Sequence, residues 1–199
     1  MLLGRDILVE ALISGDIVAF RGDYAISHTE LVIGTNSIDV TLGRQFIKVC
    51  AAPGHAYIDP WEPASLCQIP LESDTVILHP GETLLGCTQE RFEISPGAFT
   101  LLGDVGIVDI APMYEGRSTC GRLFLASHIT AGYGDVGFHS AWTLELKNMG
   151  EFALMLRAGM RIGQVAFEIV VGGTGCGYRG AYTHQHSGPK APVLGKERF

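Results

Sequence analysis

The hydrophobic pattern of the first fifteen residues has the period of a short helix. Four apolar residues fall on one helical face, Asp6 precedes them as a potential N-cap, and Gly15 follows as a stop signal. The chain is therefore predicted to begin with one helix between Asp6 and Gly15. Its apolar face consists of Ile7, Leu8, Ala11 and Leu12.

From Leu31 onward the pattern changes to short runs rich in Val, Ile, Thr and Phe, separated by HPG, SPG, GDVG, KNMG and RAG. Apolar runs separated by such turn-forming segments are typical of many short strands. In WTLELK, apolar and polar residues alternate, so a strand there places Glu145 opposite the apolar face formed by Trp142, Leu144 and Leu146. The same alternation recurs in FALMLR and QVAFEIV. Together with 26 glycines and 9 prolines, this pattern predicts an all-β fold, a jelly roll or barrel.

The periodic pattern ends near Val171. The remaining segment, GGTGCGYRGAYTHQHSGPKAPVLGKERF, is polar and aperiodic, which is typical of a tail that stays mobile unless a ligand orders it. The 199 residues are enough for one substantial core, and no change of composition divides them further. We therefore expect a single β domain over residues 1–170 and a flexible tail over 171–199.

Charge and cysteine content exclude several classes of protein. A formal net charge of −7 and a pI near 5.4 disfavour nucleic acid as a partner, since binding its phosphate backbone needs a basic face. The five cysteines are widely spaced without a C-x-x-C pair, which disfavours a disulfide framework and a structural zinc site. There is no targeting segment and no apolar run of membrane-spanning length. We expect a cytoplasmic protein, or one in the host cytoplasm if the source is viral, without a membrane partner.

Several short motifs have weak support. GCGYRG (175–180) matches a dinucleotide-binding pattern, but no helix-forming sequence follows it. His28 begins H-T-E, half of a zinc deaminase signature whose P-C-x-x-C half is missing. His184 and His186 have the spacing of a ligand pair, yet two histidines in a polar tail are more often solvated. Cys120 is interpreted as a small buried residue rather than a nucleophile.

The segment EGRSTCGR (115–122) gathers groups that bind phosphate. The hydroxyls of Ser118 and Thr119, the guanidinium groups of Arg117 and Arg122, and the amides of a glycine-rich turn all suit an anion. A turn with arginine salt bridges explains the same residues equally well. Downstream, Asp135 in a glycine turn and Glu145 in a strand supply carboxylates for sugar binding and acid–base chemistry, although a solvated strand face also accounts for Glu145.

At these residues the sequence resembles the dCTP deaminase branch of the dUTPase-like superfamily. In addition, Glu145 follows Arg122 by 23 residues, the separation between the catalytic arginine and glutamate of that family. The matching segments run through most of the chain in the order of the family: TNSIDVTLG (35–43), ILHPGETLLGCTQERFEI (77–94), GRSTCGRLFLASHITAGYGDVGF (116–138), TLELKNMG (143–150) and LRAGMRIGQVAFE (156–168).

The resemblance implies a distorted β jelly roll, a homotrimer with active sites between subunits, and a zinc-independent deamination of dCTP to dUTP and ammonia. Glu145 would be the general base, with Ser118 and Arg122 positioning the reacting groups. Mg²⁺ would enter with the triphosphate, and no metal ligand from the protein is implied. The substrate contacts would come from Arg117, Ser118 and Thr119 (triphosphate), Ala131 (base), Asp135 (3′-hydroxyl), and Tyr178, Arg179, Tyr182 and Gln185 in a tail that closes as a lid.

The sequence departs from the family pattern at three places. The segment 101–114 is longer than the family's connection, which bears on trimer packing. Ala181 stands where a phosphate-binding lysine is common, which leaves Arg179 as a substitute. The turn GYGDVGFHS lacks a proline and a second glycine near the aspartate.

Three alternatives remain open. A bifunctional enzyme of this branch would release dUMP and pyrophosphate from dCTP. A plain dUTPase would share GRS and AGYGD, but ordinarily has an apolar residue in place of Glu145 and a tyrosine in place of Phe138. A non-catalytic nucleotide-binding trimer would have lost the base or the phosphate arginines, and this chain retains both.

Overall fold

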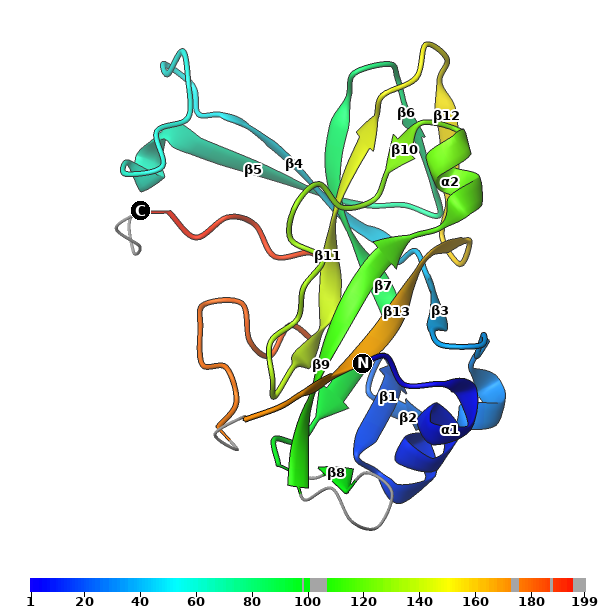
Figure 1. Ribbon diagram of the computed structural model, residues 1–199. Coiled ribbons are helices and arrows are strands. Elements are labelled where there is room, and N and C mark those ends of the chain that lie inside the picture. Colours follow the sequence, from blue (N-terminus) through cyan, green and yellow to red (C-terminus); the bar gives the residue numbers. More distant parts are fainter. Residues whose placement is uncertain (98, 101–106, 173–175, 187, 195–199) are drawn as a thin grey trace.

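The structure is a computed structural model that describes residues 1–97, 99–100, 107–172, 176–186 and 188–194 (Figure 1). Its elements, in chain order, are α1 (Arg5–Ser14), β1 (Ile17–Arg21), β2 (Tyr24–Ile26), the 3₁₀ helix η1 (His28–Glu30), β3 (Ile38–Thr41), β4 (Gln45–Ala51), the 3₁₀ helix η2 (Pro63–Ser65), β5 (Leu66–Glu72), β6 (Thr75–Leu78), β7 (Thr83–Ile94), β8 (Phe99–Thr100), β9 (Ile107–Gly116), α2 (Ser118–Arg122), β10 (Leu125–Ala126), β11 (His139–Asn148), β12 (Leu154–Arg157) and β13 (Arg161–Val170).

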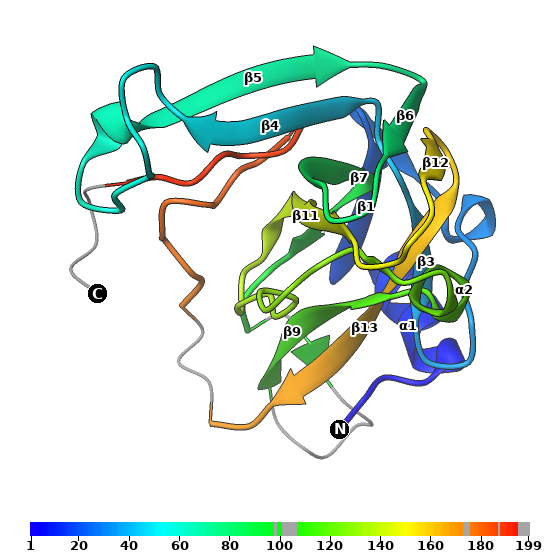
Figure 2. The same ribbon diagram turned by 90° about the horizontal axis from the view of Figure 1, so that it is seen from above.

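The strands form three sheets that do not close into a barrel. The seven-stranded sheet has the order β10-β11-β7-β1-β2, and its β4 pairs with both β7 and β5. A four-stranded sheet has the order β3-β13-β9-β8, and β12 pairs with β6. The β4–β5 hairpin extends from the rest of the chain as a long arm (Figure 2). The predicted all-β fold with a short N-terminal helix is confirmed; the barrel is not, because the outer strands are left as edges within the described residues.

The N-terminal helix α1 begins and ends close to the predicted residues. Gly15 ends it in a left-handed conformation, whereas the N-cap is Gly4 and not Asp6, which lies in the first turn. There its carboxylate faces the positive end of the helix dipole. The prediction of an Asp6 cap was therefore wrong by two residues. Leu8 and Ala11 are buried, as the apolar face required. In the described part of the chain, no helix combines the length and the apolar character that a membrane span requires.

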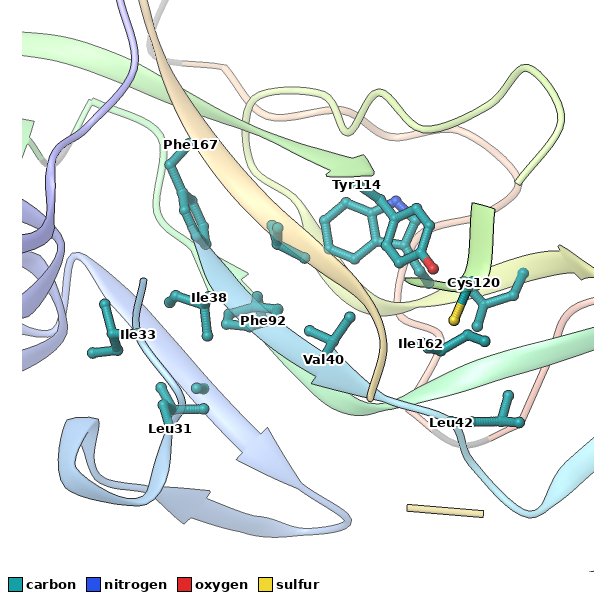
Figure 3. Packing of buried hydrophobic residues seen from close by; sticks show 14 of the residues in the cluster. Leu31, Ile33, Ile38, Val40, Leu42, Phe92, Tyr114, Cys120, Ile162 and Phe167 are labelled. Atoms are coloured by element: carbon teal, nitrogen blue, oxygen red, sulfur yellow. The ribbon is translucent and has the colours of Figure 1, made fainter. Parts of the chain in front are cut away.

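The core lies between the seven-stranded and four-stranded sheets. Phe92 of β7 packs edge-to-face against Phe167 of β13, with ring centroids 5.7 Å apart, and against Trp142 of β11. Figure 3 shows how side chains from β3, β7, β9 and β13 meet in this layer. In β11, burial alternates from Trp142 to Asn148 as predicted, so Glu145 lies on the face opposite Leu144 and Leu146.

The alternation predicted for β13 is only partly present. Its residues Val165, Ala166 and Phe167 are all buried, because this central strand is covered on both faces. In β12 the alternation is complete, with Leu154 and Leu156 buried and their neighbours exposed. Alternation in sequence therefore identifies strands here, but does not reveal which strands are buried on both sides.

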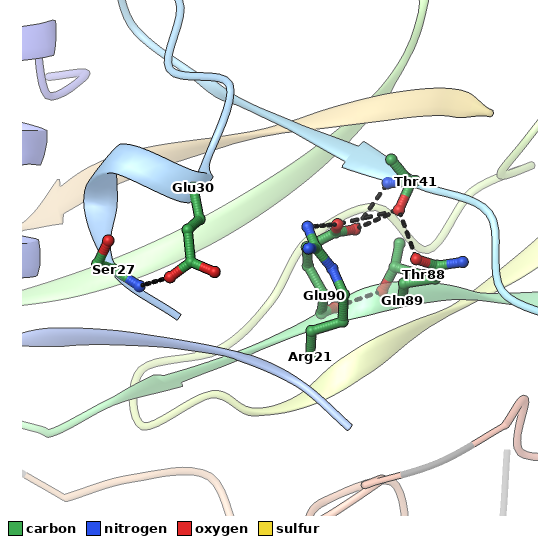
Figure 4. A network of polar contacts seen from close by, with 7 residues as sticks. All are labelled: Arg21, Ser27, Glu30, Thr41, Thr88, Gln89 and Glu90. Carbon is green, nitrogen blue, oxygen red and sulfur yellow. Dashed lines mark hydrogen bonds and ion pairs between the residues drawn. The ribbon is translucent and has the colours of Figure 1, made fainter. Parts of the chain in front are cut away.

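A buried carboxylate joins the two large sheets. Glu90 of β7 is 1% exposed and accepts hydrogen bonds from the backbone amide of Thr41 at 2.7 Å and from the Thr41 hydroxyl at 2.9 Å. Arg21 of β1 donates to the same carboxylate at 3.0 Å (Figure 4). Since Thr41 belongs to β3 and Glu90 to β7, this network links the four-stranded sheet to the seven-stranded sheet through polar contacts.

Gly163 of β13 lies directly against the side chain of Tyr114 from β9. A Cβ atom there would lie inside the van der Waals envelope of the Tyr114 phenol, which is fully buried and donates to the Ser127 hydroxyl at 2.9 Å. We expect Gly163→Ala to lower the free energy of unfolding by about 2–3 kcal/mol, because the ring has no space into which it can move. Denaturant unfolding would measure this change.

The matched control is Gly4→Ala, since no heavy atom lies within 4 Å of a Cβ atom built there. Its free energy of unfolding should change by less than about 1 kcal/mol. Equal stability of the two variants would contradict the packing argument.

Candidate functional site

A pocket of about 410 Å³ opens between β11, the loop that precedes β11, and the C-terminal segment. It brings together six of the residues predicted for the site: Ala131, Asp135, Glu145, Tyr178, Tyr182 and Gln185. Its other lining residues include Leu85, Tyr133, Phe138, His139, Thr143, Thr183 and Lys190.

Glu145 lies at one end of this pocket, on the polar face of β11. Its Oε2 atom accepts a hydrogen bond of 3.0 Å from the backbone amide of Ile129. This contact ties the carboxylate to the beginning of the loop that carries Ala131 and Asp135, both of which are exposed toward the pocket. One oxygen is thereby fixed by the protein, which orients the other toward a water or substrate proton.

The loop of residues 127–138 is held against β9 by backbone contacts. The amide of Tyr114 donates to the carbonyl of Gly132 at 2.6 Å, and the amide of Gly134 donates to Pro112 at 2.8 Å. A side chain at position 132 would place a Cβ atom 2.5 Å from the Tyr114 carbonyl oxygen, so only glycine permits this approach. The sequence AGYGD therefore forms a fixed edge of the pocket.

Aromatic packing supports the floor of the pocket. Phe138 stacks on Trp142, with ring centroids 4.0 Å apart and planes inclined by 25°. Because Trp142 is itself buried, this pair joins the end of the loop to the core. An apolar wall beside a fixed carboxylate and fixed backbone groups is suited to bind a planar nucleobase.

The described part of the C-terminal segment packs along β11. Gln185 is buried; its carbonyl accepts from the amide of Ala141 at 2.9 Å, and its amide oxygen accepts from the Thr143 hydroxyl at 2.9 Å. The Tyr178 amide donates to the Val136 carbonyl at 2.8 Å. These contacts place Tyr178, Tyr182 and Gln185 among the residues that line the pocket.

Lys190 is a lining residue that the sequence analysis missed. Its ammonium group bonds to the Ala181 carbonyl and lies 5.7 Å from the centre of the Tyr182 ring, and its amide donates to the Thr143 hydroxyl at 2.9 Å. Arg179, predicted as the substitute cation, is exposed and does not line the pocket. Eight residues separate Lys190 from Tyr182 in an aperiodic segment, so no local pattern indicates their proximity.

The phosphate-binding candidates form a short helix, not the glycine turn expected from the sequence. Residues Ser118–Arg122 are helical with Arg117 as N-cap, and neither Gly116 before the helix nor Gly121 within it has the positive φ of a turn glycine. Ser118, Thr119 and Arg122 are all exposed.

Two residues of this segment have structural contacts. Arg117 donates to the carboxylate of Asp39 at 2.5 Å, and Arg161 donates to the same oxygen at 3.2 Å. Within one chain, Arg117 therefore forms the salt bridge that the sequence analysis gave as the alternative to phosphate binding. Its guanidinium has further N–H donors besides the one bonded to Asp39. Cys120 is 4% exposed, and burial raises the pKa of its thiol, which agrees with its interpretation as a buried residue.

The two groups of predicted site residues do not meet within one chain. None of Arg117, Ser118, Thr119 and Arg122 lines the pocket that contains Glu145. Helix α2 and the C-terminal segment lie on opposite sides of the molecule in both views (Figures 1 and 2). Of the long segment 101–114, residues 101–106 lie outside the described residues, and the rest belongs to β9.

A known protein family matches most of this chain. The model of the dCTP deaminase-like family matches residues 14–170, which include the phosphate-binding candidates and Ala131, Asp135 and Glu145 of the pocket, but not the C-terminal segment. The chain belongs to the dCTP deaminase-like family. It is 33% identical over 190 residues to the "dCTP deaminase, dUMP-forming" of Halobacterium salinarum, with 89% of this chain and 90% of the relative covered. It is 30% identical over 206 residues to the "dCTP deaminase" of Halorubrum lacusprofundi, with 99% and 93% covered.

A solved structure agrees with the family's fold. The 2′-deoxycytidine 5′-triphosphate deaminase of Agrobacterium tumefaciens superimposes with a TM-score of 0.55 at 16% identity, over 85% of this chain. This chain spans about half the length of that protein, since 48% of it is covered. At this identity the likeness supports the fold.

Proposed function

We propose that this protein hydrolyses the 4-amino group of dCTP, giving dUTP and ammonia without a zinc ion. Water forms the new C–O bond at C4 while Glu145 takes its proton. The carboxyl group then returns that proton to the amino nitrogen, the C4–N bond breaks to release ammonia, and the proton of the new C4 hydroxyl moves to N3, which gives the uracil carbonyl. The observation that carries this proposal is the position of Glu145, fixed by Ile129 on the wall of the pocket that also contains Ala131 and Asp135.

In this proposal the rest of the pocket orients the nucleoside. Backbone groups at Ala131 contact the base, Asp135 accepts a hydrogen bond from the 3′-hydroxyl, and the segment with Tyr178, Tyr182 and Gln185 covers the bound nucleotide. Binding energy from these remote groups holds C4 against the water. Mg²⁺ enters on the triphosphate, held by its phosphate oxygens.

We further propose that the triphosphate is bound by a second subunit of a homotrimer. The support is the separation between the pocket and Arg117, Ser118, Thr119 and Arg122 within one chain. Leu123 and Phe124, directly after α2, are 46% and 55% exposed. An apolar pair beside cationic and hydroxyl groups is suited to a contact with the pocket of another subunit.

A second candidate is the coupled reaction that also breaks the α–β phosphate bond, releasing dUMP and pyrophosphate. The name of the Halobacterium salinarum relative favours it, as does that of a relative from Methanosphaera stadtmanae, 37% identical over 146 residues. A plain dUTPase and a non-catalytic nucleotide-binding trimer are less well supported, because neither needs a carboxylate at position 145.

The experiment is incubation of the purified protein with dCTP and Mg²⁺ after treatment with a chelator and readdition of Mg²⁺ alone. Ion-exchange chromatography would separate the nucleotides while ammonia is assayed. We expect dUTP with an equal amount of ammonia. Formation of dUMP with pyrophosphate would establish the coupled reaction. If dCTP is unchanged, dUTP would be added to the same sample, and its hydrolysis would overturn deamination.

A further inference from the structure

Three histidines from distant parts of the sequence meet beside the nucleotide pocket. One nitrogen from each of His139, His184 and His186 lies within 4.8 Å of the others. The ring of His139 is centred 4.7 Å from that of His184 and 5.5 Å from that of His186. The sequence analysis treated the two tail histidines as a solvated pair. Both are exposed, but β11 supplies a third ring.

Gln185, which lies between His184 and His186 in the sequence, fixes the backbone that carries these two rings. Gln185 is 8% exposed and bonds to Ala141, Ser140 and Gly188, while the amide of His184 donates to the carbonyl of His139 at 3.1 Å. His184 has a φ of 58°, a left-handed conformation uncommon for any residue other than glycine. The tail histidines are therefore presented by a fixed segment.

A carboxylate lies behind the His139 ring. The Nε2 atom of His139 is 2.6 Å from Glu93 Oε1, which leaves Nδ1 as the nitrogen available to a metal ion. Histidine ligands of metals commonly have such a carboxylate on their second nitrogen, where it fixes the tautomer. Arg91 is 3.3 Å from Nε2, but its charge is paired with Glu93. The ammonium of Lys190 is held by the Ala181 carbonyl.

We propose that His139, His184 and His186 bind a first-row divalent transition-metal ion such as Zn²⁺, which fastens the C-terminal segment to β11. Three imidazoles select such ions over Mg²⁺, which prefers oxygen ligands. Nitrogen ligands of tetrahedral zinc lie about 3.3 Å apart, so small ring rotations complete the site, and exposure leaves a fourth position for water.

The proposed metal has a structural role, apart from deamination. His139 and Glu145 are six residues apart on one strand, which separates them by roughly 20 Å. Metal binding would instead stabilise the packed position of the segment that covers the pocket. The inference is independent of the proposed reaction, because it concerns only the attachment of that segment.

The test is titration of untagged, chelator-treated protein with Zn²⁺ by calorimetry, and with Co²⁺ by visible absorption. We expect one ion per chain, and at least about tenfold weaker binding for each of His139→Ala, His184→Ala and His186→Ala. Glu93→Gln should weaken binding by about tenfold through the orientation of His139. Trypsin cleavage after Arg179 and Lys190 should slow when Zn²⁺ is bound.

Two control variants are His79→Ala, an exposed histidine outside the cluster, and Cys176→Ser, which removes an exposed thiol. Both should bind Zn²⁺ as the unaltered protein does. Absence of saturable binding, or equal binding by the His184→Ala/His186→Ala double variant, would overturn the proposal. So would loss of binding in Cys176→Ser, since the ion would then be held by sulfur.

Discussion

Replacing Glu145 with glutamine is expected to lower kcat for dCTP deamination by about 10²- to 10⁴-fold, while the Kd for dCTP changes little. Glutamine keeps the shape of the side chain and an oxygen that accepts the hydrogen bond from Ile129, so the loop 127–138 retains its position. What is lost is the group that takes the proton from water. Ammonia release under saturating dCTP would measure kcat, and calorimetry would measure the Kd.

Glu151→Gln is the matched control for Glu145→Gln, because Glu151 is an exposed carboxylate in the turn after β11, outside the pocket. This variant should keep the kcat of the unaltered protein. Full deamination by Glu145→Gln would exclude Glu145 as the general base. Loss of dCTP binding together with activity would assign Glu145 a binding role instead.

Mixing two inactive variants is expected to restore activity. Glu145→Gln changes the pocket, whereas Arg122→Ala changes the segment that we propose binds phosphate, which does not line that pocket within one chain. In a random mixture of equal amounts, about one site in four combines an intact pocket with an intact neighbouring segment. The mixture should therefore reach about a quarter of the unaltered kcat, a gain of about 25-fold or more over Glu145→Gln alone.

Subunits would be exchanged by mild denaturation and refolding, and differently tagged chains would verify mixed trimers. The control pairs Arg122→Ala with Ser118→Ala, since both changes affect the same segment and no combination yields an intact site. Recovery in this control, or no recovery in verified mixed trimers of the first pair, would contradict a site shared between subunits.

Much of the fold was predictable because local patterns determine it. The period of Ile7 to Leu12 predicted α1, and alternation in WTLELK predicted both β11 and the exposed face of Glu145. Helix α2 was not predictable in this way. It spans five residues, too short for a hydrophobic period, and its glycines suggested a turn. The cap at Gly4 lacks any side-chain signal.

The candidate site was predictable where its residues are close in sequence. Asp135 and Glu145 belong to adjacent elements, so a pocket between them follows from local order. Gln185 packs on Ala141 through a hydrogen bond between residues more than forty positions apart. Lys190 approaches Tyr182 through a hydrogen bond to Ala181 within an aperiodic tail. No local pattern in the sequence indicates either contact. The same holds for the meeting of His139 with the tail histidines.

The buried Glu90 carboxylate limits which single substitutions this sequence can accept at positions 21, 41 and 90. Loss of Arg21, or of the Thr41 hydroxyl, would leave the buried carboxylate with fewer hydrogen-bond partners and so lower the free energy of unfolding. Replacement of the carboxylate alone would strand the amide and hydroxyl of Thr41. Replacing this network by apolar side chains one position at a time would pass through a less stable protein in which some of the polar groups lack partners. We therefore expect these three positions to change together, although Arg21 and Glu90 are 69 positions apart in the sequence.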